Sequence, residues 1–247
     1  MEVLPLSIKT GVIVLTRTGE EMGQTLKRLL KRTIPKSLIA VFRKGYKELT
    51  ISVKHTNGVM HSRIYRGQNN LKINCGCGPV IKKGWVNIDL CPGVDLTLDL
   101  REKFPFTDNS CAIVYSEHFF EHLDYPHEAT FFLKESLRVL KHGGVFSVGV
   151  PDTVWPMTAY FNPDNTDYFK YAKEIFHPKW CVTRMEHINY HFRQEGEHLF
   201  AYDFETLKYI LEKCGFREVK QRNFDPSLDS ESRKLGTLYV DAIKPTF

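Results

Sequence analysis

Residues 71–89 constrain the fold of this chain more than any other stretch, because a tight glycine turn joins two short apolar runs there. The first run begins at Leu71, and the turn Gly76-Cys77-Gly78 follows it at once. The second run ends on the carboxylate of Asp89. Glycines just past a strand let the backbone turn sharply and pass close to a ligand. Ligands of open α/β sheets bind beyond the carboxyl ends of the strands, so we expect Asp89 to accept hydrogen bonds from the two hydroxyls of a ribose.

The details of this turn narrow the class of nucleoside cofactor. A dinucleotide fingerprint needs a third glycine three residues after Gly78, where this chain has Ile81. It also places the ribose-binding acid about 20 residues further on, and Asp89 follows Gly78 much sooner. The chain has no G-x-x-x-x-G-K-[ST] phosphate-binding loop. The pattern therefore favours a nucleoside cofactor without a pyrophosphate.

The same stretch resembles motif I of the class I S-adenosylmethionine-dependent methyltransferases. It is most like a group that has a Gly-Cys-Gly-Pro turn, a short first helix and a Gly-Trp-Val-Asn-Ile-Asp second strand. The likeness extends over residues 71–245 and includes Leu-Arg-Val-Leu-Lys-His-Gly-Gly, where the family usually has proline in place of His142. This resemblance implies a Rossmann-like fold and S-adenosylmethionine as the cofactor.

The resemblance also implies which residues hold each part of the cofactor. These residues are Asn74, Gly76 and Gly78 at the methionine part, Asp89 at the ribose, Asp99 with the Leu100 backbone at the adenine, and Ser116 and Glu117 at the methionine end. Asn74 stands where the family often has an acid, and its alternative role is to bond its own turn. The alternative for Asp99 is an acid on a surface loop.

Apolar runs that suit strands alternate with segments of helical period from residue 71 onward. Strands are predicted at residues 71–74, 85–90, 95–100, 112–115, 145–150, 217–224 and 237–243, and helices at 126–140 and 203–214. This alternation predicts an α/β fold: a Rossmann-like, mostly parallel seven-stranded sheet with helices on both faces. The methyltransferase domain would span residues 69–247, with a lid insertion at 155–200 after strand five and a basic N-terminal extension before it.

That extension, residues 1–68, is predicted to hold helices and a hairpin. A capping-box pattern begins at Thr18, a second helix begins near Ser37, and Asn57-Gly58 is a type I′ turn signal. Residues 1–66 hold 13 Lys or Arg against 4 Asp or Glu, and the remainder holds 21 against 25. The basic character therefore belongs to the extension.

Two interpretations of the basic extension stay open. One is a helical segment packed on the catalytic domain. The other is a cationic surface, residues 18–47, that contacts an anionic membrane or an acidic partner. Few aromatic residues interleave with the basic ones, which argues against nucleic acid.

Methyl transfer to oxygen requires a base near the acceptor hydroxyl. His118 follows strand four and Asp152 follows strand five, so both candidate bases lie at the ligand-binding edge of the predicted sheet. The nearby Glu121-His122 pair is interpreted as local packing and capping.

The insertion is rich in aromatic and histidine side chains, which suit a sugar or flat-ring acceptor. His187-x-x-x-His191 has metal-ligand spacing but lacks the glutamate of H-E-x-x-H, so no metal is expected.

The sequence thus predicts an S-adenosylmethionine-dependent methyltransferase resembling those of bacterial cell-surface glycan synthesis, with O-methylation of a sugar or glycan-type acceptor as first choice. A methyltransferase of a small metabolite and a non-catalytic S-adenosylmethionine-binding module are the alternatives. An epimerase or dehydrogenase fits less well, because the third glycine and a Tyr-x-x-x-Lys are missing.

The sequence also predicts a cytoplasmic protein, peripheral to the inner membrane face. Its six cysteines have no repeating spacing, and it shows no apolar run of about 18 residues and no signal-peptide pattern.

Overall fold

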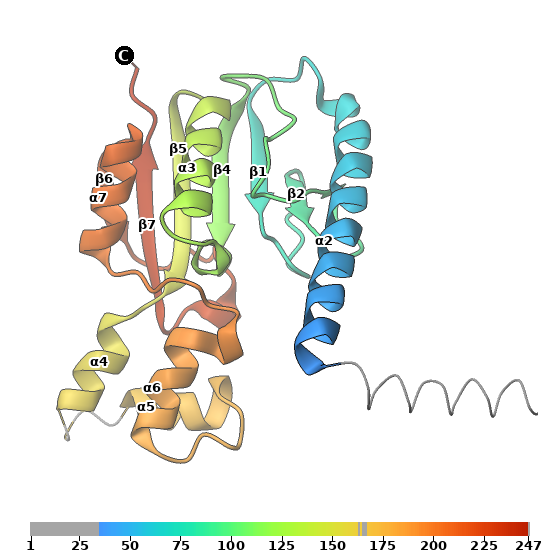
Figure 1. Cartoon of the computed structure of the whole chain (residues 1–247). Helices are drawn as coiled ribbons and strands as arrows, with labels where there is room; N and C mark the ends of the chain where they lie inside the picture. The colour runs from blue at the N-terminus through green and yellow to red at the C-terminus, as the bar shows by residue number, and fades with distance from the viewer. Residues whose placement is uncertain (1–34, 163, 165–166, 247) are drawn as a thin grey trace, which may run out of the picture. The chain divides into compact units, whose positions relative to one another are not determined.

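The computed structural model describes residues 35–162, 164 and 167–246, which are coloured in Figure 1. The chain divides into two compact units, residues 1–50 and 51–247. The division falls within helix α2 (Lys36–His61), which confirms the helix predicted near Ser37. The helix predicted from Thr18 lies outside the described residues. Among the helices that are described, none combines the length and apolar character needed to cross a membrane.

The second unit is built on a seven-stranded mixed sheet, as predicted. The strands lie in the order β3-β2-β1-β4-β5-β7-β6. Neighbours among β1 to β5 pair in parallel, and β7 runs antiparallel to both β5 and β6. The bounds are β1 (Leu71–Cys75), β2 (Val86–Asp89), β3 (Leu96–Thr97), β4 (Cys111–Glu117), β5 (Leu140–Pro151), β6 (Arg217–Arg222) and β7 (Thr237–Ile243).

The strand order reverses between β1 and β4. The chain builds outward through β2 and β3 on one side of β1, and through β4 and β5 on the other. At the carboxyl ends of the central pair, Cys75 is paired with Ser116. A reversal of this kind opens a crevice beyond the strand ends, where open α/β sheets bind their ligands. The glycine turn after β1 and the polar residues after β4 therefore meet at one place.

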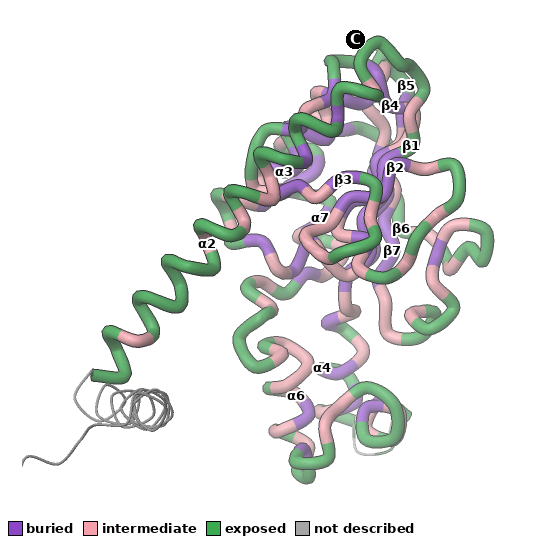
Figure 2. Tube along the Cα trace, turned by 90° about the vertical axis from the view of Figure 1, so that its right-hand side faces the viewer, coloured by how far each residue is buried: buried purple, intermediate pink, exposed green. Residues whose placement is uncertain are grey.

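Helices α3 (His127–Val139) and α7 (Phe204–Cys214) lie together over one face of the sheet (Figure 1). Asp203 caps α7 by accepting a hydrogen bond from the Thr206 amide, as its position before the helix predicts. Between these helices and the strands, the rings of Phe132 and Phe216 both pack on Phe146. Figure 2 shows the buried residues concentrated along the strands, so the sheet forms the centre of the core.

The insertion after β5 is helical. It contains α4 (Val154–Phe161), α5 (Asp167–Tyr171), the π-helical turn η3 (Ala172–Phe176), α6 (Arg184–Arg193) and the short η4 (Gln194–Gly196). It has a small apolar cluster of its own, in which Trp155 packs on Tyr168, Ala159 and Ala172. Thr183 and Glu186 form a reciprocal capping box that fixes the start of α6.

The predicted hairpin near residues 50–65 is wrong, because α2 continues to His61 and the short η1 (Ser62–Tyr65) follows it. Gly58, which was taken as a turn residue, is instead a buried residue of this helix. A Cβ at Gly58 would lie 2.1 Å from the Thr97 carbonyl oxygen. A residue without a Cβ is therefore needed where the helix approaches the β3 backbone. A type I′ turn also requires glycine at this position, so the Asn-Gly pair did not distinguish the two structures.

Most element bounds differ from prediction by one or more residues, and the differences are largest at β3 and at the start of β5. The third strand is only Leu96–Thr97, because the chain leaves the sheet before Asp99. Helix α3 ends at Val139, and Leu140 already pairs with β4, so β5 begins there and not at residue 145 as predicted. The crossover from β1 to β2 is short and contains turns and irregular segments but no helix, whereas the resemblance implied a short first helix.

Candidate functional site

The glycine turn after β1 is joined directly to the end of β2. The Asp89 carboxylate accepts a hydrogen bond from the Gly78 amide at 2.8 Å and another from the Cys91 amide at 2.9 Å. Gly78 has a φ of +51°, and no atom lies within 4 Å of where its Cβ would be. The structure thus brings together Asp89 and Gly78, with open space beside the turn. Their contact with the cofactor stays a prediction.

Asn74 and Gly76, two other residues predicted to bind the cofactor, make contacts within the protein. The buried Asn74 amide group donates to the Val80 carbonyl at 3.0 Å and to Asn87 Oδ1 at 3.1 Å, so it bonds its own turn. Gly76 has a φ of +66°, and its Cβ would lie 2.2 Å from the ring of Phe119. Gly76 therefore lets the segment after β4 pack against the turn.

Asp99 and Leu100, which were predicted to end the third strand and to contact the adenine, instead lie just after β3. Both Asp99 oxygens accept hydrogen bonds from the Arg101 guanidinium, at 2.8 to 3.2 Å. Burial raises the pKa of the Asp99 carboxyl, but the hydrogen bonds and charge of Arg101 outweigh it and lower the pKa overall. Leu100 is part of the apolar core. The Arg101 backbone amide also donates to Asp99 Oδ1 at 3.0 Å, so this carboxylate is bonded locally and its contact with an adenine stays a prediction.

Ser116 and Glu117 end β4 and have different surroundings. Ser116 Oγ is fully buried and has no hydrogen-bond partner in the described part of the chain. Glu117 accepts hydrogen bonds from the Ser230 amide at 3.1 Å, the Ser230 hydroxyl at 2.5 Å and the Tyr239 hydroxyl at 2.9 Å. Arg233 donates to the Glu117 backbone carbonyl. Glu117 therefore anchors the segment between β6 and β7 to the carboxyl edge of the sheet.

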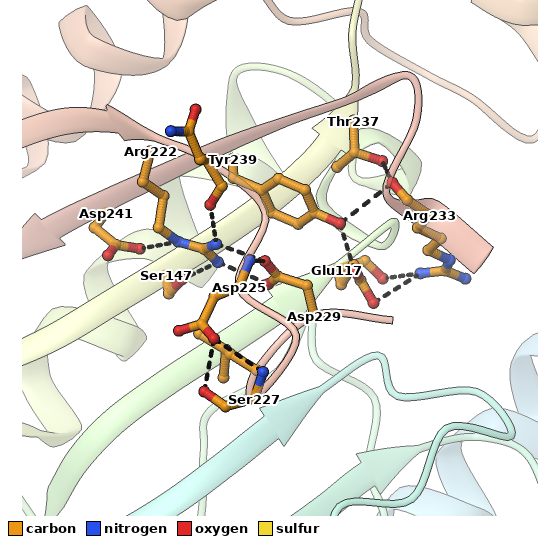
Figure 3. A network of polar contacts seen from close by, with 12 residues as sticks. Glu117, Ser147, Arg222, Asp225, Ser227, Asp229, Arg233, Thr237, Tyr239 and Asp241 are labelled. Carbon is orange, nitrogen blue, oxygen red and sulfur yellow. Dashed lines mark hydrogen bonds and ion pairs between the residues drawn. The ribbon is translucent and has the colours of Figure 1, made fainter. Parts of the chain in front are cut away.

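The Glu117 contacts continue into a buried ion-pair network (Figure 3). Arg222 of β6 pairs with Asp229 at 2.6 Å and with Asp241 at 2.9 Å, and it also donates to the Ser147 hydroxyl. Tyr115 of β4 donates to Asp229 at 3.0 Å. The sequence analysis did not single out these residues, because no local spacing links β4 to the segment before β7.

A pocket of about 290 Å³ lies at the same edge of the sheet. Its lining comes from the ends of β4 and β5, from the insertion and from residues 232–236 before β7. Most of the wall is aromatic or histidine: His118, Trp155, Tyr168, Phe176, His177, Tyr190, His191 and His198. Arg233 and Gln194 add polar groups. The insertion therefore forms part of the pocket wall at the carboxyl edge of the sheet, and its role as a lid over a ligand stays a prediction.

Of the two predicted bases, His118 lines this pocket. Its Nε2 is 2.8 Å from Thr237 Oγ1, and Thr237 donates to the Arg233 carbonyl, so His118 Nε2 must donate to Thr237. Burial and the charge of Arg233 hold the pKa of His118 well below its usual value. Asp152 is placed differently. Its carboxylate accepts from the Val154 amide at 2.9 Å, at the start of α4.

Beside the pocket, a buried carboxylate faces three imidazoles. Glu121 Oε1 lies 3.7 Å from His118 Nδ1, 3.9 Å from His122 Nε2 and 3.9 Å from His198 Nε2. Burial raises the pKa of Glu121 to about 8. The sequence analysis interpreted Glu121-His122 as local packing. It missed His198 because this residue comes from the end of the insertion, far along the chain.

The pair His187 and His191 does not form a joint site. His187 Nδ1 is 2.9 Å from His177 Nδ1, and Cys181 lies beside them within the same cluster. His191 Nε2 instead bonds the Asp152 carbonyl at 3.0 Å. Burial lowers the pKa of His177 to about 3 and that of His191 to about 4.

Comparison with protein families places residues 86–148 in a family model described as a methyltransferase domain. This stretch runs from β2 to β5 and includes Asp89, Asp99, Ser116 and His118. No curated protein matches the chain. The family match, on a sheet of this order, indicates an S-adenosylmethionine-dependent methyltransferase with S-adenosylmethionine as its cofactor.

Solved structures of the same general kind also match. A Thermotoga maritima protein described as a possible histamine N-methyltransferase is 17% identical, with 82% of this chain and 96% of that chain covered and a TM-score of 0.42. An Archaeoglobus fulgidus methyltransferase is 17% identical, with 75% of this chain and 92% of that chain covered and a TM-score of 0.42. Haemonchus contortus phosphoethanolamine N-methyltransferase 2 is 13% identical, with 77% of this chain and 52% of that chain covered and a TM-score of 0.44. At these scores the likenesses carry no conclusion about the acceptor.

Proposed function

We propose that this methyltransferase transfers the methyl group of S-adenosylmethionine to a hydroxyl of a sugar or glycan-type acceptor. The observation that supports this acceptor is the aromatic pocket beside the carboxyl ends of β4 and β5. Aromatic rings pack against the apolar faces of a sugar, while histidine, arginine and glutamine side chains bond its hydroxyls. At about 290 Å³ the pocket suits one sugar ring or the end of a longer glycan. A small metabolite with one ring is the second candidate, because the same volume would enclose it.

Methyl transfer from a sulfonium is an in-line displacement, so alignment of donor and acceptor supplies most of the catalysis. The pocket and the glycine turn after β1 lie at one edge of one sheet, which supports such an alignment. An oxygen acceptor also loses its proton as it attacks. We propose His118 as the base, since it lines the pocket, whereas the Asp152 carboxylate caps α4.

Transfer of an isotope-labelled methyl group tests the proposed acceptor. The purified protein is incubated with S-adenosylmethionine carrying a trideuterated methyl group and with cell extract separated into glycan and small-metabolite fractions. We expect mass spectrometry to find the label on sugar residues released by acid hydrolysis, and we expect His118→Ala to incorporate much less. Label that appears only on non-sugar metabolites, or only on nitrogen, would refute the sugar hydroxyl as acceptor.

We further propose that residues 18–47 contact an anionic membrane surface. Within the described part of this segment, Lys36, Arg43, Lys44 and Lys47 accompany the exposed apolar side chains of Val41, Phe42 and Tyr46. A basic residue near an anionic headgroup layer contributes about 1 kcal/mol, and salt screens this attraction over about 8 Å at physiological ionic strength.

The membrane proposal predicts that the full chain sediments with phosphatidylglycerol vesicles at low salt and is released as salt rises. A full-length variant in which Lys36, Arg43, Lys44 and Lys47 are replaced by glutamine should sediment far less. Its affinity for S-adenosylhomocysteine should stay unchanged, because no predicted cofactor residue is altered. Equal sedimentation of the two proteins would reject the membrane contact.

A further inference from the structure

Glu121 is the only carboxyl group among the buried side chains that have no hydrogen-bond partner in the described part of the chain. Its side chain is 2% exposed, and neither oxygen accepts a hydrogen bond from another described residue. Burying a carboxylate without a donor or a cation is costly, and folded proteins rarely tolerate it. This carboxylate sits in the short turn η2 (Phe120–His122), just after β4. Something with positive charge is therefore expected beside it.

The nearest side chains are suited to hold a metal ion there. Ligand atoms of Glu121, His122 and His198 all lie within 4.8 Å of one another. Each of the two imidazole Nε2 atoms is 3.9 Å from Glu121 Oε1. In a tetrahedral zinc site, bond lengths near 2.1 Å place the ligand atoms about 3.4 Å apart. Each of the two distances from Glu121 Oε1 would therefore have to shorten by about half an ångström for these groups to close around an ion.

The far nitrogens of both imidazoles are held in the way that metal-binding histidines need. His122 Nδ1 is 2.9 Å from the Glu197 carbonyl oxygen, and His198 Nδ1 is 3.0 Å from the His191 carbonyl oxygen. A carbonyl only accepts, so both Nδ1 atoms carry the proton. Each Nε2 therefore presents a lone pair toward Glu121. Second-sphere hydrogen bonds of this type fix the tautomer and ring orientation of metal ligands.

The backbone already holds the two ligand-bearing segments together. The amides of Leu199 and Phe200 both donate to the Glu121 carbonyl, at 2.8 and 3.2 Å. His198 is therefore brought to Glu121 without any metal. Ordering the site on binding costs little, because its ligands are positioned in advance.

We propose that Glu121, His122 and His198 bind a divalent first-row transition metal, for which Zn²⁺ is the best fit. Two imidazole nitrogens and one carboxylate oxygen suit zinc and its neighbours, whereas calcium and magnesium prefer oxygen ligands alone. The ion joins the turn after β4 to the end of the insertion. His118, whose Nδ1 is 3.7 Å from Glu121 Oε1, lines the aromatic pocket, so the ion would lie close to that pocket.

The second cluster of the insertion, His177, Cys181 and His187, has to be separated from this site in any test. The test therefore uses a full-length Cys181→Ser/His187→Gln background, treated with EDTA and then titrated with ZnCl₂ by calorimetry. We expect this background to bind one equivalent of Zn²⁺. Adding Glu121→Gln, which preserves the shape of the side chain, should weaken that binding at least tenfold, and adding His198→Gln should do the same.

A thermal melt of the same proteins provides an independent measurement. Zn²⁺ should raise the Tm of the background, because a ligand that binds the folded state stabilises it, and at the same Zn²⁺ concentration it should raise the Tm of the Glu121→Gln protein less. The Glu121→Gln protein should melt no lower than the background in EDTA, since glutamine keeps the shape of the side chain and the carboxyl oxygens that it replaces have no hydrogen-bond partner. His198→Gln, at a partly buried position, serves if Glu121→Gln does not fold. A folded background that binds no Zn²⁺, or equal binding after both changes, would overturn the proposal.

Discussion

Replacing Asp89 with alanine is expected to weaken the binding of S-adenosylhomocysteine by about ten- to a hundred-fold. The carboxylate would accept charge-assisted hydrogen bonds from the ribose hydroxyls, and each such bond contributes about 1.5–3 kcal/mol. Its two bonds to the Gly78 and Cys91 amides hold it at the turn, so its position is fixed before the cofactor arrives. Calorimetric titration of the full-length protein measures the loss directly.

Asp95 offers a matched control for the Asp89 change. Its carboxylate also accepts from a backbone amide, that of Asn87 at 2.8 Å, and it likewise holds the β2 region in place. Asp95→Ala should therefore lower stability in a similar way while it changes cofactor affinity by less than about threefold, since no charge-assisted bond to the ligand is lost. If both variants bind S-adenosylhomocysteine equally well, Asp89 is not the ribose ligand.

The part of the site that the sequence could predict is the part encoded locally. The glycine turn and Asp89 are close along the chain, and a strand, a turn and a second strand leave few ways to arrange them. The structure accordingly joins Gly78 to Asp89 by a direct hydrogen bond. The seven strands followed from their apolar runs in the same manner, and the cap of α7 followed from Asp203 alone.

The rest depended on contacts between distant segments. The bond from Ser230 to Glu117 and the approach of His198 to Glu121 join residues that no spacing rule connects. The hairpin error has a related cause. Glycine is needed at position 58 because the helix lies against the Thr97 backbone there. The Asn-Gly pair alone does not distinguish this requirement from that of a turn. Tertiary packing decided each of these cases.

The largest effect on stability is expected at Asp229. Its carboxylate is completely buried and accepts hydrogen bonds from Arg222, from the Tyr115 hydroxyl and from the Asp225 amide. Removal of one partner from a buried ion pair leaves the other charge uncompensated, which costs about 3–5 kcal/mol. Asp229→Ala should lower the free energy of unfolding by about that amount, as measured by urea denaturation.

The exposed pair of Glu231 and Lys234, 3.3 Å apart in the same segment, supplies the control for Asp229. Ion pairs that face solvent contribute about 0–1 kcal/mol, so Glu231→Ala should shift the urea midpoint little. Because the segment that follows Asp229 supplies Arg233 to the pocket proposed for the acceptor, Asp229→Ala should also weaken acceptor binding. A loss below about 1 kcal/mol would mean that Arg222 is adequately paired by Asp241 alone, and that the buried network does not hold the pocket wall in place.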